Sequence, residues 1–88
     1  MPMLRALQLV AEDGARLAEL RPQPRFSPRE LDCVRLLVRG FTDEQMAARL
    51  AISHATVRFH LDGARRKAAA RSRTHLAALA VAQGVAQP

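Results

Sequence analysis

Residues 52–67 of this 88-residue chain read ISHATVRFHLDGARRK, and two different sets of side chains recur along them at helical spacing. Val57 and Leu61 lie about one turn apart and define an apolar face, which the sequence predicts to be buried. Phe59 and Arg58 fall away from that face, so an aromatic ring points outward among arginines. Guanidinium groups present a rigid fork of hydrogen-bond donors, and aromatic rings pack on flat apolar surfaces. The outer face of this predicted helix is therefore a candidate binding surface.

The charge of the chain favours a polyanion as the ligand of that surface. Fourteen lysines and arginines against eight acidic residues give a formal net charge of +6. Residues 1–24 contain three arginines and three acids, so the whole surplus lies in residues 25–88. Residues 54–73 alone hold six basic residues and one acid, Asp62. Such a local excess is typical of nucleic-acid binding, with an ordinary solvated basic surface as the alternative.

Other kinds of chemistry have no support in the sequence. There is no acid–base pair, nucleophile site or phosphate-binding loop, so no enzymatic activity is expected. His54 and His60 lack an accompanying cluster of ligands, so we expect no metal and no cofactor. The single cysteine, Cys33, excludes an internal disulfide and is expected to be a buried thiol. No apolar run approaches the ~18 residues of a membrane span, and the start does not resemble a signal peptide, which predicts a cytoplasmic protein.

Two prolines in RPQPR, at residues 21–25, divide the chain because proline ends a preceding helix. We expect residues 1–24 to form a helical extension with a proline linker, and residues 25–88 to form the main domain. The stretch MLRALQLVAEDGARLAEL places leucines at roughly helical spacing, which predicts one short N-terminal helix or two shorter ones.

Start signals after the boundary predict an all-α domain. In FSPRE, Ser27 caps a helix, a proline takes the first helical position and Glu30 follows three residues after the cap. Glu30 also projects into the inward stripe, so it is expected to be a cap or a buried ion-pair residue. Gly40 ends this helix. Its inward residues are predicted to be Leu31, Val34, Leu37 and Val38.

The next start signals predict two helices separated by a short turn. Thr42 caps the first of them, and Ser53 caps the second after the two-residue turn. A last helix is predicted over SRTHLAALAVAQG, with Gly84 just past its end. Two helices joined in this way, the second basic on its outer face, are typical of a helix-turn-helix.

The second helix of a helix-turn-helix places its N-terminal residues in the major groove of DNA. Small Ala55 would allow close approach, Arg58 could bond guanine, and Phe59 could pack on a thymine methyl or a sugar. Phe59 could instead contact a partner subunit or the N-terminal helix. The residues expected to hold phosphates are Arg65, Arg66, Lys67, Arg71 and Arg73.

Residues 26–85 resemble the LuxR-type (GerE-type) helix-turn-helix domain. The resemblance rests on four stretches: FSPREL, RGFTDEQMAARLAIS, TVRFHLDGARRK and SRTHLAALAVAQGV. The string VRFHLDGARRK is most similar to the quorum-sensing branch of that family. The resemblance implies a four-helix domain whose third helix reads DNA. It also implies a homodimer on a two-fold-symmetric site, paired largely through the last helix.

The resemblance also assigns expected roles to single residues. Arg58 and Phe59 match groove-facing positions. Positions that contact the DNA backbone are matched by Ser53, Thr56 and Lys67. A second apolar edge of the last helix, the expected dimer contact, consists of Ala78, Val81, Ala82 and Val85.

Three departures from the family pattern bear on function. Asp62 stands where many relatives have a basic or neutral residue. Ala51 stands where relatives carry glycine and the turn needs a left-handed backbone, which costs alanine about 1 kcal/mol. Alanines at residues 68–70 replace leucine, glycine and a further apolar residue. The leucines of the N-terminal helix are expected to fill the space that a lost leucine leaves in the core.

Residues 1–24 are too short for a ligand-binding or phosphoacceptor domain. The leading interpretation is therefore a dimeric, sequence-specific transcription regulator that lacks a sensor domain and binds double-stranded DNA. One alternative is a short interaction protein that pairs with full-length LuxR-type regulators and blocks them, with weak or no DNA binding. Another is a module like region 4 of sigma factors, which touches RNA polymerase as well as promoter DNA; the last helix argues against this one.

Overall fold

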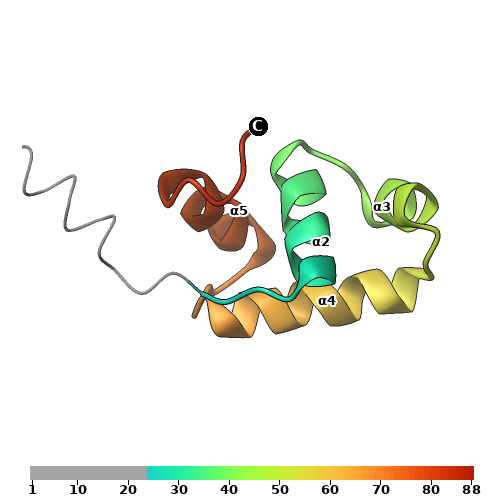
Figure 1. Cartoon of the computed structure of the whole chain (residues 1–88), viewed down its shortest axis with the longest axis horizontal. Coiled ribbons are helices and arrows are strands. Elements are labelled where there is room, and N and C mark those ends of the chain that lie inside the picture. Colours follow the sequence, from blue (N-terminus) through green and yellow to red (C-terminus); the bar gives the residue numbers. More distant parts are fainter. Residues whose placement is uncertain (1–23) are drawn as a thin grey trace, which may run out of the picture.

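The computed structural model describes residues 24–88, and within this range the chain forms four α-helices and no strand (Figure 1). The predicted all-α, four-helix domain is therefore confirmed. The helix expected before the proline boundary, and its proposed filling of the core, lie outside the described residues. The helices are α2 (Pro28–Val38), α3 (Asp43–Leu50), α4 (His54–Lys67) and α5 (Arg73–Ala82).

The helix starts follow the predicted caps. The Ser27 Oγ accepts a hydrogen bond from the Glu30 backbone N–H at 3.1 Å, and Glu30 Oε1 accepts one from the Ser27 N–H at 2.7 Å. Thr42 and Gln45 make the same reciprocal pair at the start of α3, with distances of 3.1 and 2.9 Å. This second capping box was not predicted. Both boxes satisfy backbone N–H groups that have no partner inside their helices.

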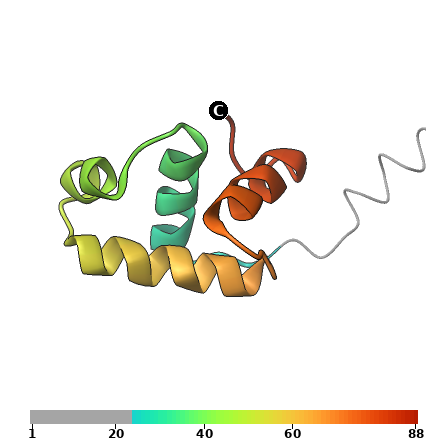
Figure 2. The ribbon, with the colours of Figure 1, turned by 180° about the vertical axis from the view of Figure 1, so that it is seen from behind.

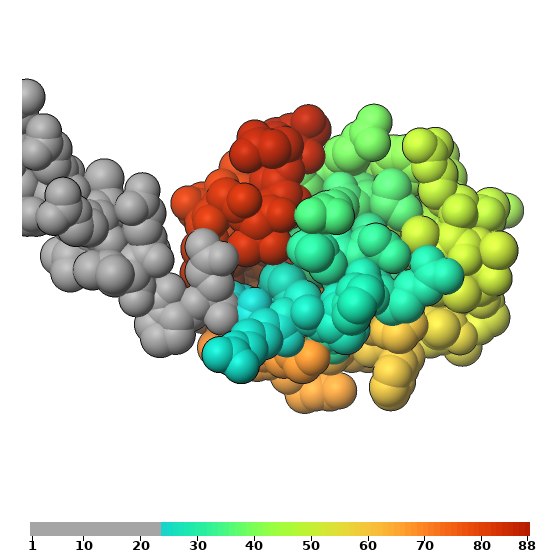
Figure 3. Space-filling view, in the orientation of Figure 1, coloured from blue at the N-terminus to red at the C-terminus, as the bar shows by residue number. Residues whose placement is uncertain are grey.

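The four helices are arranged around α2. Its N-terminal end lies at α4, while α3 and α5 lie on opposite sides of it, as two views from opposite directions show (Figures 1 and 2). The segment that leads into α2 passes between α5 and α4 on one face of the molecule (Figure 3). Buried apolar residues come from all four helices and from the segments after α4 and α5: Cys33, Val34, Leu36, Met46, Ala47, Val57, Leu61, Ala64, Ala70, Leu76, Ala80 and Ala86.

The buried part of α2 is wider than the predicted inward stripe. Val34 is fully buried as expected, but Leu36 is buried too, whereas Leu31, Leu37 and Val38 are only half-buried. The reason is the central position of α2, which packs against α3, α4 and α5. A helix with neighbours on several sides buries a wider arc than the single stripe of a surface helix.

Two alanines adopt a left-handed backbone, one before and one after α4. Ala51 has φ 56° and ψ 45°, as its place in the turn predicted, and Ala69 has φ 53°. The side chain of Ala69 is exposed, whereas the next residue, Ala70, is buried in the core. The alanine run therefore reverses the chain after α4 and returns it to the core. Because the Cβ atom crowds the backbone in this conformation, both connections of α4 are strained.

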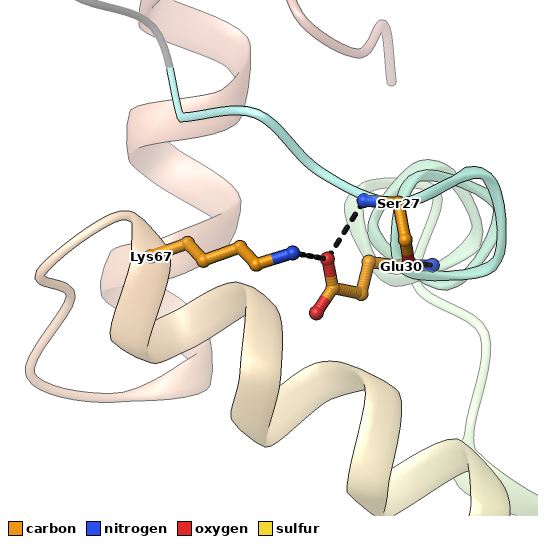
Figure 4. Close-up of polar contacts among 3 residues, drawn as sticks. All are labelled: Ser27, Glu30 and Lys67. Carbon is orange, nitrogen blue, oxygen red and sulfur yellow. Dashed lines mark hydrogen bonds and ion pairs between the residues drawn. The ribbon is translucent and has the colours of Figure 1, made fainter.

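A buried carboxylate joins α2 to α4 (Figure 4). Glu30 is only 7% exposed, and its Oε1 lies 2.5 Å from the Lys67 Nζ. Gly63 makes room for this carboxylate, because a methyl group at that position would overlap Glu30 Oε2. Glu30 is thus both a cap and an ion-pair residue, the two roles that the sequence left open.

The surroundings of Glu30 favour its ionised form. Burial alone would raise its pKa. The hydrogen bond from Lys67, the N–H of Ser27 and the positive charge of Lys67 outweigh burial, and the pKa lies below its ordinary value of 4.5. A carboxyl group whose pKa is lowered in the folded state stabilises the fold at pH values above its unfolded-state pKa. This contribution is lost as the pH falls through the folded-state value.

We expect the free energy of unfolding to fall as the pH drops below about 4.5, in part because Glu30 becomes protonated. Glu30→Gln should be less stable than the wild type at pH 7, and the difference should narrow towards pH 3. Urea unfolding followed by circular dichroism between pH 3 and pH 7 measures this. A difference that stays constant over the range would contradict the assignment. Lys67→Gln should also reduce the pH dependence of the free energy of unfolding, because Lys67 is one of the groups that lower the pKa of Glu30.

Ala51→Gly and Ala69→Gly should each raise the free energy of unfolding by about 1 kcal/mol. A left-handed backbone costs alanine about 1–2 kcal/mol, which exceeds the extra entropy that glycine loses on folding. Ala48→Gly is the matched control, because Ala48 is an exposed residue within α3. This change should instead lower stability by about 1 kcal/mol. Loss of stability in all three variants would show that the two positions carry no strain.

Candidate nucleic-acid interface

The helices α3 and α4 and the turn between them form a helix-turn-helix. The Ile52 N–H bonds the Ala47 carbonyl at 3.0 Å, and the left-handed Ala51 turns the chain away from α3. Ser53 then caps α4, with its Oγ 3.0 Å from the Thr56 backbone N and 2.8 Å from the Thr56 Oγ1. The two hydroxyls therefore lie together at the exposed start of α4, where backbone N–H groups favour anions.

The two faces of α4 differ sharply in exposure. Val57 and Leu61 are completely buried, which confirms the predicted core face. Phe59 is 68% exposed and is the most exposed large apolar side chain of the described residues. The ring meets the His60 ring edge-on, with 5.5 Å between centroids. Beside it Arg58 is also exposed, so an aromatic ring and a guanidinium group share the outer surface.

Further residues of the expected site lie along the same helix. Ala55 and Arg66 are exposed, while Thr56 and Arg65 are half-buried. The Arg65 Nη1 donates to the Ala70 carbonyl at 3.4 Å, which ties its side chain to the segment after α4. Ala55 and Arg66 are therefore exposed like Arg58 and Phe59, whereas Thr56 and Arg65 are partly covered.

Two of the cations expected to hold phosphates are engaged inside the domain. Lys67 pairs with Glu30, as described above, and Arg73 pairs with Asp43. The Arg73–Asp43 pair joins the first turns of α5 and α3. Nothing in the sequence indicated this contact, because 30 residues separate the partners. The other three cations, Arg65, Arg66 and Arg71, take part in none of the ion pairs found among residues 24–88.

Asp62 is exposed on α4, about one helical turn from both Arg58 and Arg66. Opposite charges at this spacing attract weakly on a helix surface. The carboxylate therefore reduces the positive potential between the two arginines, on the side of α4 that carries the other expected contacts.

The expected dimer edge on α5 is exposed in part. Ala78 and Ala82 are exposed, and Val81 is 40% exposed. Val85 lies beyond the end of α5 and does not share this edge of the helix. The helix ends at Ala82, the chain reverses at Gly84 (φ 70°), and Val85 packs half-buried against the core. The sequence pattern was extended past a helix end that the glycine creates.

A cluster that the sequence did not suggest lies where α2 leads into α3. Phe41 is half-buried, and the guanidinium carbons of Arg39 and Arg49 lie 5.7 and 5.6 Å from its ring centroid. The two arginines are ten residues apart, so only the fold brings them to one ring. Contacts of this kind orient exposed cations over an aromatic face.

Three observations on residues 24–88 concern the cysteine, metal ligands and membrane spans considered in the sequence analysis. Cys33 is fully buried; burial, with a smaller effect from the negative charge of Asp32, raises the pKa of its thiol, so the thiol stays protonated. Residues 24–88 contain no group of three metal-ligating side chains. Among these residues there is also no helix with the length and apolar character that crossing a bilayer requires.

Comparisons with known proteins agree with this geometry. The family described as "Bacterial regulatory proteins, luxR family" matches residues 24–80, which contain the whole helix-turn-helix. The transcriptional activator protein RaiR of Rhizobium etli is 46% identical over 44 residues, which are 50% of this chain and 18% of that protein. The luxR family consists of DNA-binding regulators rather than enzymes. With most of its length matched and its helices in place, this chain belongs to the luxR family of bacterial regulatory proteins.

Proposed function

We propose that this protein binds specific sequences of duplex DNA as a homodimer and regulates transcription. The observation that carries the proposal is the 68% exposure of Phe59 beside Arg58, opposite a completely buried core face of α4. A free monomer gains nothing from such a surface, whereas the major groove admits one helix with this outer face. Bacterial DNA lies in the cytoplasm, which is where the proposed function would be carried out.

In the proposed complex the first turns of α4 lie against base edges. Arg58 forms two hydrogen bonds to a guanine, and Phe59 packs on a thymine methyl group. Ala55, which is small and exposed, permits close approach of the helix. Ser53 and Thr56 offer their hydroxyls to the DNA backbone at the helix start, while Arg65 and Arg66 hold phosphates further along.

The partner for dimerisation is a second copy of this chain, paired through α5. The exposed Ala78, Val81 and Ala82 support this proposal, because they form an apolar edge outside the core. Isologous pairing gives two-fold symmetry, which matches a two-fold-symmetric site on DNA.

A second candidate function is pairing with full-length LuxR-type regulators to block them. Asp62 favours this alternative, since its carboxylate on α4 lies near two of the cations expected to meet DNA. The alternative keeps the same α5 edge for pairing and requires weak DNA binding or none. Measurements on DNA therefore separate the two functions.

Arg58→Ala should remove the preference for a selected DNA site and retain non-specific binding. A two-pronged arginine–guanine contact discriminates against a wrong base by about 1–3 kcal/mol. Arg66→Ala should weaken binding to all sequences. It should also lower the magnitude of the slope of log K against log salt concentration by about 0.9, because one phosphate contact is lost. Titration of selected and random duplexes by fluorescence anisotropy at several salt concentrations measures both effects.

The matched control for these variants is Arg35→Ala, which removes an exposed arginine of α2. This change should leave the preference for the selected site unaltered. If the wild type binds its best selected sequence no better than random duplex at near-physiological salt, the regulator function is refuted. Pairing with a full-length regulator would then be the remaining function.

Val81→Glu should convert the dimer to monomer without loss of helical content, because it places a charge in the proposed apolar contact. Sedimentation velocity over a range of concentrations, together with circular dichroism, checks this. Gln87→Glu, at an exposed position after α5, adds the same charge as a control and should leave the dimer intact. A wild type that stays monomeric at high concentration, with and without DNA, would exclude the proposed dimer.

A further inference from the structure

Lys67 does not extend freely from α4 towards solvent. Its side chain turns from the last residue of the helix towards the start of α2, where Nζ lies 2.5 Å from Glu30 Oε1 (Figure 4). The family resemblance assigns this lysine to the DNA backbone. The geometry instead gives its ammonium group a partner inside the domain.

The carboxylate that holds Lys67 is itself firmly anchored. Glu30 Oε1 also accepts the backbone N–H of Ser27, so moving the carboxylate away would open the cap of α2. Gly63 leaves the space that the other carboxylate oxygen occupies. With a side chain only 9% exposed, Glu30 is far more restricted than a surface partner would be. An anchored carboxylate of this kind holds a cation at a smaller entropic cost than an exposed ion pair pays, because only the lysine side chain has to be ordered.

The side chain of Lys67 is nevertheless 44% exposed. A DNA phosphate near the end of α4 would therefore compete with Glu30 for the same ammonium group. Arg66, the preceding residue, is exposed and takes part in none of the ion pairs found within residues 24–88. The two neighbouring cations thus differ in one respect that matters for binding, namely whether their charge is already neutralised.

We propose that Glu30 withholds the charge of Lys67 from DNA phosphates and thereby limits sequence-independent affinity. This inference rests on the proposed DNA binding and refines it. Phosphate contacts strengthen binding to all sequences alike, so one contact fewer favours the specific site over random DNA. Glu30 is accordingly a positioning residue that acts on specificity through Lys67.

The test is the salt dependence of binding to a random-sequence duplex, measured for the full chain. Each phosphate contact adds about 0.9 to the magnitude of the slope of log K against log salt. Lys67→Gln should leave the wild-type slope unchanged, whereas Arg66→Gln, the matched control, should lower it by about 0.9. Glu30→Gln should raise the slope by about 0.9, because it frees Lys67 for a phosphate. The double variant Glu30→Gln/Lys67→Gln should return to the wild-type slope.

A merely structural ion pair would change melting temperature but would not produce this pattern of slopes. The inference is overturned if Lys67→Gln lowers the slope as Arg66→Gln does, or if folded Glu30→Gln keeps the wild-type slope. Circular dichroism establishes that each variant is folded at the assay temperature. If Glu30→Gln is not folded, Lys67→Gln alone decides, because Lys67 lies outside the core. A wild type that binds no duplex at any salt refutes the proposed function as well, and the two failures are thus distinguishable.

Discussion

One-sided burial of α4 is the constraint on which the rest of this small domain depends. A helix that presents side chains to a groove can be fixed in place only by contacts on its other side, which faces the core. Val57 and Leu61 are completely buried while Phe59 is 68% exposed, so the helix is divided into two chemically separate faces. The stabilising free energy of the buried face comes from removing apolar surface from water. The outer face contributes little to folding and is therefore free to carry residues that serve binding.

Apolar burial is non-directional, so other contacts must fix the orientation of α4 within the domain. The Glu30 carboxylate supplies one of them, because it links the cap of α2, the backbone near Gly63 and Lys67 at the helix end. Left-handed alanines before and after α4 supply sharp turns at both of its ends. The domain thus uses strained connections to orient the helix, at some cost in stability. Strain of this kind is common where backbone geometry serves a function.

Charge in the domain is divided between cations that hold the fold together and cations left for a ligand. Lys67 and Arg73 pair with carboxylates of α2 and α3, whereas Arg58 and Arg66 remain exposed on α4. The Arg73–Asp43 pair also connects the start of α5 with the start of α3, two helices that otherwise make no close backbone contact. Electrostatics therefore links the helix proposed for dimerisation to the helix-turn-helix.

The sequence by itself determined the local features of this protein. Caps, prolines and glycines act within a few residues, so four helices, the turn at Ala51 and the outward position of Phe59 could be predicted. Tertiary structure decided what depends on distant contacts. The central position of α2 widened its buried arc, the reversal at Gly84 removed Val85 from the α5 edge, and the fold engaged Lys67 with Glu30, 37 residues away. Helical periodicity fixes which way a side chain leaves its own helix, but only packing fixes which other helix it meets.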